Sequence, residues 1–355
     1  MGTPERDIRV MVVDDSASVR EMISAILLSE PGINVVGTAA NGKEAVAGAS
    51  SLRPDLITMD IEMPVMGGLE AIERIMAEHP VPILVITSLT GVRTAFAAVS
   101  KGALDVIEKP EIDLTGRRSL IRKVRILARV DMAAHMASKG VRTGAASPVV
   151  GMRRSPPETG RASVPGLRVV AIASSTGGPQ AIQAILAHLP ANFPAPVVIA
   201  QHIAEGFTRG MAEWLGSSTR LRVREAVHGD TLMPGFVFIN PAEFSMRITH
   251  QGKVVLEKAE QRRGYHPSCD TLLRSVADSC RERSLGLILS GMGDDGVEGI
   301  TAISSAGGAT LAQDEQSSVI YGMNRLAVER GRVDRVIPLC DIPAELMRLV
   351  GGKGK

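Results

Sequence analysis

Two serines, a threonine and two glycines end an apolar run in VVAIASSTGGPQ at 169–180, and a helical pattern, AIQAILAHL, follows. Glycines let the chain turn sharply, and a helix that begins behind the turn favours negative charge in front of it. The stretch lacks the lysine of a phosphate loop, the spacing of a dinucleotide fingerprint and the GxSxG of a hydrolase elbow. The turn can still expose a serine as a nucleophile and stabilise a developing oxyanion.

A serine nucleophile needs a general base and a group that orients the base. His202 directly follows the apolar run VVIAQ, and Asp294 and Asp295 follow the run LGLIL. Because the carboxyl ends of parallel strands meet at one edge of a sheet, these groups are expected to converge on the serines. His266, in GYHPSCD, is a weaker candidate for the base. Four other histidines are less suited to this role because they fall in the first domain or linker, in a helical pattern or in a turn: His79, His135, His188 and His250.

Acidic side chains also end apolar runs in the first part of the chain. Asp14 and Asp15 follow VMVV, and Asp60 follows LITM. Three carboxylates at one sheet edge repel each other unless a cation lies between them, and oxygen ligands of this kind suit Mg²⁺. Thr87 and Lys109 end two further runs, and their hydroxyl and ammonium groups complete a site for a transferring phosphoryl group.

The elements that must position these residues alternate between short apolar runs and helical patterns. Five such runs between 8 and 127 predict a compact (βα)5 domain over 7–127. Residues 128–166 are rich in Gly, Pro, Ser and Arg and predict a linker. Alternation resumes over 167–350 and predicts a doubly wound, mostly parallel α/β domain, with a small antiparallel hairpin around HQGK at 250–253.

Composition excludes several classes of function. The 355 residues are 45% hydrophobic, 22% charged and 3% aromatic, with a net charge of +2, so neither a basic surface nor an aromatic platform for nucleic acid is expected. No apolar run approaches the ~20 residues that span a bilayer, and acidic residues precede the first apolar run. We expect no membrane insertion. The three cysteines, Cys269, Cys280 and Cys340, are interpreted as reduced thiols of a cytoplasmic protein.

The first domain resembles a response-regulator receiver domain through VVDDS, MDIEMPVMGG, ITS and EKP, in that order. The resemblance implies that a histidine kinase phosphorylates Asp60 and that Thr87 and Lys109 contact the phosphoryl oxygens. It also implies the ligands of the Mg²⁺ ion: Asp14, Asp15, Asp60 and the carbonyl of Glu62. Val106 stands where receivers often carry an aromatic residue, so the usual aromatic switch is not expected.

The second domain resembles the catalytic domain of the CheB family of chemotaxis protein-glutamate methylesterases. The matching segments are ASSTGGPQAI, VVIAQHI, GYHPSCDTLLRS, LSGMGDDGVEG and SSVIYGM. The resemblance implies that Ser175 is the nucleophile, His202 the general base and Asp295 the residue that orients it, while the backbone N–H of Met292 helps to form the oxyanion hole. The chain departs from the family pattern at Ser174, Asp294 and Asn324.

What the resemblance implies about function is a hydrolase activated by phosphorylation. Such an enzyme removes γ-glutamyl methyl esters from the cytoplasmic helices of chemoreceptors, releases methanol and deamidates receptor glutamines. Its phosphodonor is a histidine kinase of the CheA type, the esterase reaction uses no cofactor, and the unphosphorylated receiver covers the catalytic cleft.

Three alternatives remain from the residues themselves. A non-catalytic binding module regulated by phosphorylation could hold an anion at SSTGG. A DNA-binding output domain is disfavoured, since no helix-turn-helix pattern with a basic recognition helix is found. A cysteine hydrolase could use Cys269 beside His266, but we expect Cys269 to be a buried structural thiol, placed at neither a helix tip nor a strand tip.

Overall fold

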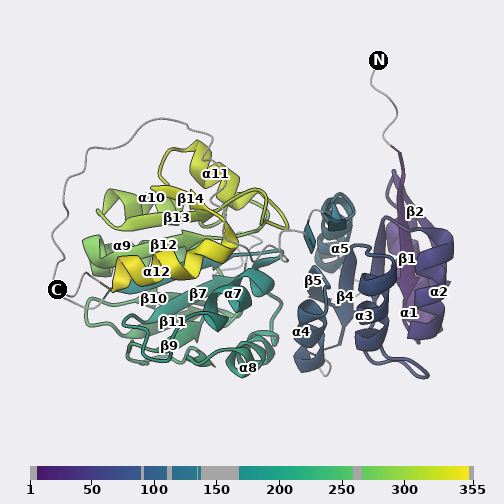
Figure 1. Cartoon of the computed structure of the whole chain (residues 1–355), viewed down its shortest axis with the longest axis horizontal. Coiled ribbons are helices and arrows are strands. Elements are labelled where there is room, and N and C mark those ends of the chain that lie inside the picture. The colour runs from purple at the N-terminus through teal and green to yellow at the C-terminus, as the bar shows by residue number, and fades with distance from the viewer. Residues whose placement is uncertain are drawn as a thin grey trace, which may run out of the picture.

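The computed structural model describes residues 6–88, 92–109, 114–133, 135–136, 168–258 and 266–351. Two α/β halves lie side by side, the first in purple and blue and the second in teal to yellow (Figure 1). Most of the predicted linker over 128–166, namely residues 134 and 137–166, lies outside the described residues, so its boundaries remain predictions. Within the described residues, no helix has the length and apolar character to cross a membrane.

The first half is a five-stranded parallel sheet with the order β2-β1-β3-β4-β5. Its core strands are apolar on both faces, as helices on both sides of a parallel sheet require. The strands are β1 (Ile8–Val13), β2 (Ile33–Ala39), β3 (Leu56–Met59), β4 (Ile83–Thr87) and β5 (Asp105–Glu108). The helices are α1 (Ala17–Leu28), α2 (Gly42–Leu52), α3 (Gly68–Glu78), α4 (Val92–Ser100) and α5 (Leu114–Leu127).

The second half contains a seven-stranded parallel sheet with the order β14-β13-β12-β6-β7-β9-β8. Its strands are β6 (Val169–Ser174), β7 (Val197–Gln201), β8 (Arg222–Glu225), β9 (Phe236–Ile239), β12 (Ser284–Ile288), β13 (Ala309–Gln313) and β14 (Arg335–Ile337). The helices are α7 (Gly178–Ala187), α8 (Thr208–Ser218), α9 (Cys269–Cys280), α10 (Val297–Ser305), α11 (Met323–Glu329) and α12 (Ile342–Val350). The predicted α/β fold class is confirmed.

The small antiparallel hairpin around 250–253 is confirmed. Strands β10 (Phe244–Ile248) and β11 (Val254–Lys258) pair antiparallel and form a separate sheet. The apolar run FVFI at 236–239 is β9, which pairs in parallel with β7 and β8 inside the large sheet. Local sequence showed that a strand was present there but could not show which strand it pairs with.

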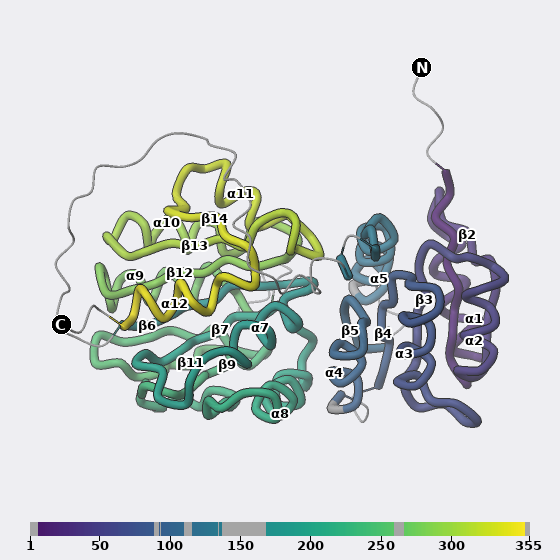
Figure 2. The backbone as a smooth tube through the Cα atoms, in the orientation of Figure 1, coloured from purple at the N-terminus to yellow at the C-terminus, as the bar shows by residue number. Residues whose placement is uncertain are grey.

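Helix α4 of the first half packs against α7 and α8 of the second half (Figure 2). The Phe96 ring of α4 stacks on the Trp214 ring of α8, with ring centroids 5.6 Å apart. The buried Gln180 side chain, on α7, donates to the carbonyls of Val99 and Ala103 at 3.0 and 2.8 Å. The α4-β5-α5 face of the first half is therefore the one turned toward the second half (Figure 1).

Candidate active site

Ser175 lies at the tip of β6, in a turn that tolerates only glycine at two positions. Gly177 has φ +78°, and a Cβ on it would lie 2.6 Å from the Val319 side chain. A Cβ on Gly178 would lie 2.1 Å from Oε1 of Gln201. Since neither position has room for a side chain, the TGG sequence is what lets α7 begin immediately behind Ser175.

Gln201 holds the segments of Ser175 and His202 together from beneath. Its Nε2 donates to the carbonyl of Ser175 at 2.8 Å and to that of His202 at 2.9 Å. Its Oε1 accepts a hydrogen bond from the Ser174 hydroxyl at 2.6 Å, which gives this second serine a structural partner. Our sequence analysis missed Gln201, although a buried glutamine at the end of an apolar strand was a visible signal.

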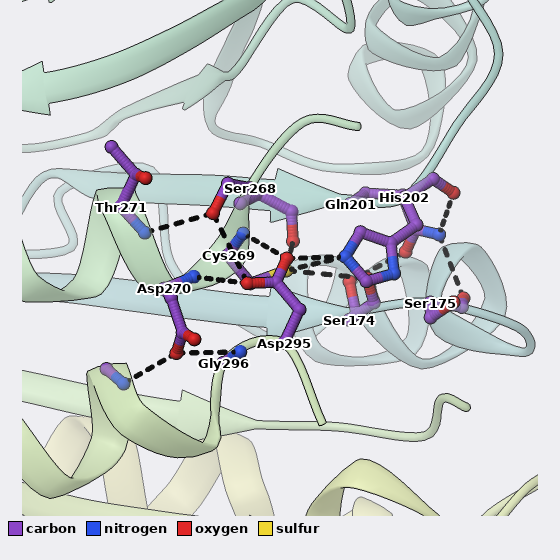
Figure 3. Close-up of polar contacts among 12 residues, drawn as sticks. Ser174, Ser175, Gln201, His202, Ser268, Cys269, Asp270, Thr271, Asp295 and Gly296 are labelled. Atoms are coloured by element: carbon purple, nitrogen blue, oxygen red, sulfur yellow. Dashed lines mark hydrogen bonds and ion pairs between the residues drawn. The ribbon is translucent and has the colours of Figure 1, made fainter. Parts of the chain in front are cut away.

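His202 and Asp295 form the polar pair of the site. Nε2 of His202 lies 2.8 Å from Oδ2 of Asp295, and both side chains are largely buried. The imidazole ring lies between the carboxylate and Ser175 (Figure 3). The three residues follow β6, β7 and β12, which are neighbours in the sheet. The structure thus brings the predicted hydroxyl, imidazole and carboxylate to one sheet edge.

The N-terminus of α9 fixes the Asp295 carboxylate. It accepts hydrogen bonds from the backbone N–H of Cys269 at 2.7 Å and of Asp270 at 3.0 Å, and from the Ser268 hydroxyl at 3.3 Å. Burial alone would raise the pKa of Asp295, but the hydrogen bond from His202 and those from the helix N-terminus lower it below its usual range. Asp295 is therefore an ionised partner for the histidine.

Cys269 is the first residue of α9, so our expectation that it lies at no helix tip was wrong. Its sulfur lies 3.5 Å from Nε2 of His202 and 3.4 Å from the carbonyl of Ala200. Burial, together with the nearby Asp295 carboxylate, raises the pKa of the thiol well above its usual value. A protonated, fully buried thiol argues against a cysteine nucleophile. His266 lies nearby through its backbone carbonyl, which accepts from Ile203.

Met292 lies in the loop that follows β12 and runs past Ser175. A Cβ on the preceding Gly291 would lie 2.7 Å from Cβ of Ser175, so the two segments are in close contact. In the part of the chain that the structure describes, no hydrogen bond uses the backbone N–H of Met292 or of Thr176. Thr176, which our sequence analysis did not consider, directly follows the serine, where hydrolases commonly place an oxyanion donor.

The other departures from the family pattern have ordinary structural partners. The buried Asn324 donates through Nδ2 to the carbonyl of Gln313 at 3.0 Å and to the Ser318 hydroxyl at 2.8 Å. The carbonyl of Asp294 accepts from the N–H of Val297 at the start of α10. Neither residue enters the group formed by Ser175, His202 and Asp295.

A second cluster lies at the carboxyl edge of the first sheet. Nζ of Lys109 lies 2.8 Å from the carboxylates of both Asp14 and Asp60. Burial raises the pKa of Asp60 above its usual value, although the hydrogen bond from Lys109 acts in the opposite direction. Burial alone would lower the pKa of Lys109, but the hydrogen bonds that it donates to Asp14 and Asp60 raise it. Asp15 is exposed beside them, and Thr87 is buried at the end of β4.

This cluster fits a hard divalent cation. One oxygen from each of Asp14, Asp15 and Asp60 lies within 4.8 Å of the others, a donor set of the kind that Mg²⁺ prefers. Glu62 is in the loop after β3, and its role through the carbonyl stays a prediction. Val106, at the position of the missing aromatic, is partly buried and packs against the apolar core of the first half and against the cluster that includes Phe96 and Val99.

An N-terminal acidic phosphoacceptor-type site joined to a Ser-His-Asp constellation defines a response regulator with a hydrolase-like output domain. Residues 10–119 match the response regulator receiver domain, and residues 170–346 match the CheB methylesterase domain. The chain belongs to the CheB methylesterase family.

Two relatives match this chain over nearly its whole length. A protein-glutamate methylesterase/protein-glutamine glutaminase 3 of Paramagnetospirillum magneticum is 44% identical over 97% of this chain and 96% of its own. A protein-glutamate methylesterase/protein-glutamine glutaminase 2 of Anaeromyxobacter dehalogenans is 44% identical over 97% of this chain and 98% of its own. The crystal structure of the Thermotoga maritima CheB methylesterase catalytic domain is 38% identical, covers 52% of this chain and 100% of its own, and has a TM-score of 0.51.

Proposed function

We propose that this protein hydrolyses γ-glutamyl methyl esters on chemoreceptors, releasing methanol, and deamidates receptor glutamines, under the control of phosphorylation. The observation that carries the proposal is the 2.8 Å contact between His202 and Asp295, set beside the serine-bearing turn. The full-length similarity to protein-glutamate methylesterases/protein-glutamine glutaminases supports it.

The chemistry follows from which imidazole nitrogen meets the acid. Nε2 faces Asp295, so it carries the proton, and Nδ1 has the lone pair that accepts the proton of the Ser175 hydroxyl. The serine oxygen attacks the ester carbonyl, and the N–H groups of Met292 and Thr176 stabilise the oxyanion. Each such donor is worth about 10²–10³ in rate. Histidine returns the proton to the leaving methanol, and water then releases the glutamate carboxylate.

The same site accounts for deamidation. A glutamine side chain presents the same carbonyl with a nitrogen leaving group in place of methoxide. Since ammonia is the poorer leaving group, protonation by the His202 imidazolium matters more, and the amide is the slower substrate.

Contacts between the halves support control by the receiver domain. Nζ of Lys123, on α5, pairs with Asp105 and lies 3.3 Å from the hydroxyl of Thr176, the neighbour of Ser175. A receiver side chain thus reaches the catalytic turn in the unphosphorylated chain. Phosphorylation of Asp60 adds charge beside Lys109, the residue just beyond β5, and we propose that it loosens this face and opens the site.

For phosphorylation itself, Asp14, Asp15, Asp60 and the Glu62 carbonyl would hold Mg²⁺, which neutralises charge during phosphoryl transfer. Asp60 is the acceptor, and Thr87 and Lys109 contact the phosphoryl oxygens. The phosphodonor is a histidine kinase of the CheA type, and the substrate is the cytoplasmic helices of receptors, so a cytoplasmic location is part of the proposal.

The test is methanol release from a methylated receptor signalling domain, with and without a small phosphodonor. Full-length protein is expected to release methanol faster with the phosphodonor, and Ser175→Ala is expected to release none. Ser174→Ala, which removes the adjacent hydroxyl that bonds Gln201, is the matched control and should keep most of the activity. Receptor binding without methanol release by the unaltered protein would favour the non-catalytic binding module instead.

A further inference from the structure

Two groups of potential metal ligands stand out in the described residues, and only one belongs to the receiver. The other is His202, Cys269 and Asp295, whose ligand atoms all lie within 4.8 Å of one another. The catalytic proposal uses the imidazole and the carboxylate but gives the thiol no role. A soft sulfur, an imidazole nitrogen and a carboxylate oxygen together form a donor set that zinc accepts.

The sulfur–nitrogen separation agrees with a tetrahedral ion. With Zn–S and Zn–N bonds of about 2.3 and 2.0 Å, tetrahedral geometry places sulfur and nitrogen about 3.5 Å apart. Sγ of Cys269 and Nε2 of His202 are 3.5 Å apart. Nitrogen and carboxylate oxygen, at 2.8 Å, need to separate by about half an ångström to reach the tetrahedral spacing. That is a small adjustment of two side chains.

We propose that His202, Cys269 and Asp295 form an inhibitory site for a thiophilic divalent cation such as Zn²⁺. The ion takes the place of the proton between Nε2 and the carboxylate and bonds the Cys269 sulfur, and the thiol proton goes to solvent. The fourth position is filled by water, on the side where His202 keeps some exposure. The nearby carbonyl of Ala200, which the thiol contacts, is left without that donor.

Inhibition follows from the tautomer that the ion imposes and rests on the proposed function. A neutral imidazole that ligates metal through Nε2 carries its proton on Nδ1. That nitrogen then has no lone pair for the Ser175 hydroxyl, so the nucleophile is not activated. The ion also removes Asp295 from its role as the partner of a protonated histidine.

The experiment measures metal binding and activity separately in the full chain, with excess Mg²⁺ present to occupy the receiver. Cys340→Ser is the background because Cys340 is the exposed cysteine. Cd²⁺ is the spectroscopic probe, since thiolate–cadmium bonds absorb in the ultraviolet and carboxylate sites do not. The background protein should show this band at one ion per chain, and adding Cys269→Val should remove it. Cys269→Ser serves as a second variant, and circular dichroism checks that both fold.

Zn²⁺ should inhibit methanol release, and a chelator should restore it. Removing a residue that only orients a metal ligand typically lowers metal affinity by about 10–100-fold, and removing the ligand itself should lower it at least as much. Each Cys269 variant should therefore need at least about tenfold more Zn²⁺ for half inhibition. Equal inhibition of the background protein and the Cys269 variants by Zn²⁺, or no cadmium band in the background protein, would refute the proposed metal site. A cadmium band in a protein that has no esterase activity would support the metal site but refute the proposed function.

Discussion

Gln201 joins the two segments that carry Ser175, the proposed nucleophile, and His202, the proposed base. Three hydrogen bonds from one buried side chain fix the carbonyls of Ser175 and His202 and the hydroxyl of Ser174. None of these bonds touches a reacting atom, so Gln201 is a positioning residue. Errors of even about 1 Å at a reacting group cost about 10²-fold in rate, which makes such a residue catalytically significant.

Gln201→Leu keeps the volume and removes all three bonds. Each buried polar group left without a partner costs about 1–3 kcal/mol, and we expect a loss of about 3 kcal/mol in the free energy of unfolding. We also expect kcat to fall at least about tenfold with a smaller change in KM. Urea unfolding and steady-state kinetics measure the two effects. Gln251→Leu, at an exposed turn, is the control, and equal effects in both variants would contradict the positioning role.

Secondary-structure elements act on the site through their ends. Ser175 and His202 directly follow β6 and β7, whereas Asp295 lies in the loop after β12, just before Gly296 at the start of α10. The first turn of α9 holds the Asp295 carboxylate. Strand tips could be predicted because a polar residue after an apolar run marks the end of a buried strand. The helix tip was missed although its signals were present: Pro267 precedes Ser268, whose hydroxyl caps the helix by accepting from Thr271.

Other features could not be obtained from local sequence. The parallel pairing of β9 with β7 joins segments about 40 residues apart in sequence, and an apolar run does not specify its neighbour. The contact between Cys269 and His202 depends on how the start of α9 packs against the end of β7, and a short sequence motif does not specify this packing. Polar residues that follow apolar runs were therefore predictable, whereas the pairing of β9 and the contact between Cys269 and His202 were not.

At the C-terminal end of the fold, Glu345 ties α12 to β14. Its carboxylate, which is largely buried, bonds Arg348 on the same helix and Arg335 on the strand, both at 2.6 Å. The pKa of Glu345 lies below its usual value. The hydrogen bond from Arg348 is the main cause and Arg335 adds to it, and together they outweigh the effect of burial, which raises the pKa. Because the folded-state pKa is depressed, this stabilisation is complete above the unfolded value of about 4.3 and is lost as the pH falls through the folded value.

Glu345→Gln should lower the free energy of unfolding at pH 7 by about 1 kcal/mol, since both arginines are half exposed and solvent screens the pair. The variant should lose less stability than the unaltered protein between about pH 5 and pH 3. Urea titrations across this range measure both. Glu329→Gln, in an exposed pair with Arg325, should be nearly neutral. Parallel stability curves for Glu345→Gln and the unaltered protein would contradict the argument.

On the scale of the whole molecule, the receiver face meets the catalytic half through both apolar and polar contacts. Phe96 and Trp214 stack at α4 and α8, while Lys123 reaches Thr176 from α5. Val106, where an aromatic switch is absent, packs on the apolar cluster that includes Phe96 and Val99 of α4, the helix that meets the second half. We infer that β5 and the ends of α4 and α5 carry the signal from Asp60 in place of a rotating ring.

Trp214 is the chain's only tryptophan and reports on this contact directly. Its ring is largely buried against Phe96, and its Nε1 donates to the Ser100 hydroxyl at 3.2 Å. Phosphorylation should separate α4 from α8, expose the indole and shift its fluorescence to longer wavelength. Asp60→Asn should show no shift with the same phosphodonor, and Ser175→Ala should shift as the unaltered protein does. An unchanged spectrum in fully phosphorylated protein would contradict domain separation.

The order of the two halves along the chain has a consequence for biosynthesis. During translation the N-terminal half leaves the ribosome first and folds as a unit. Ser175 and His202 emerge next, but Asp295 comes about a hundred residues after them, so a growing polypeptide holds an incomplete catalytic group. If the receiver half inhibits the enzyme as proposed, it is already folded when Asp295 is synthesised, and we expect the new protein to be inactive until it is phosphorylated.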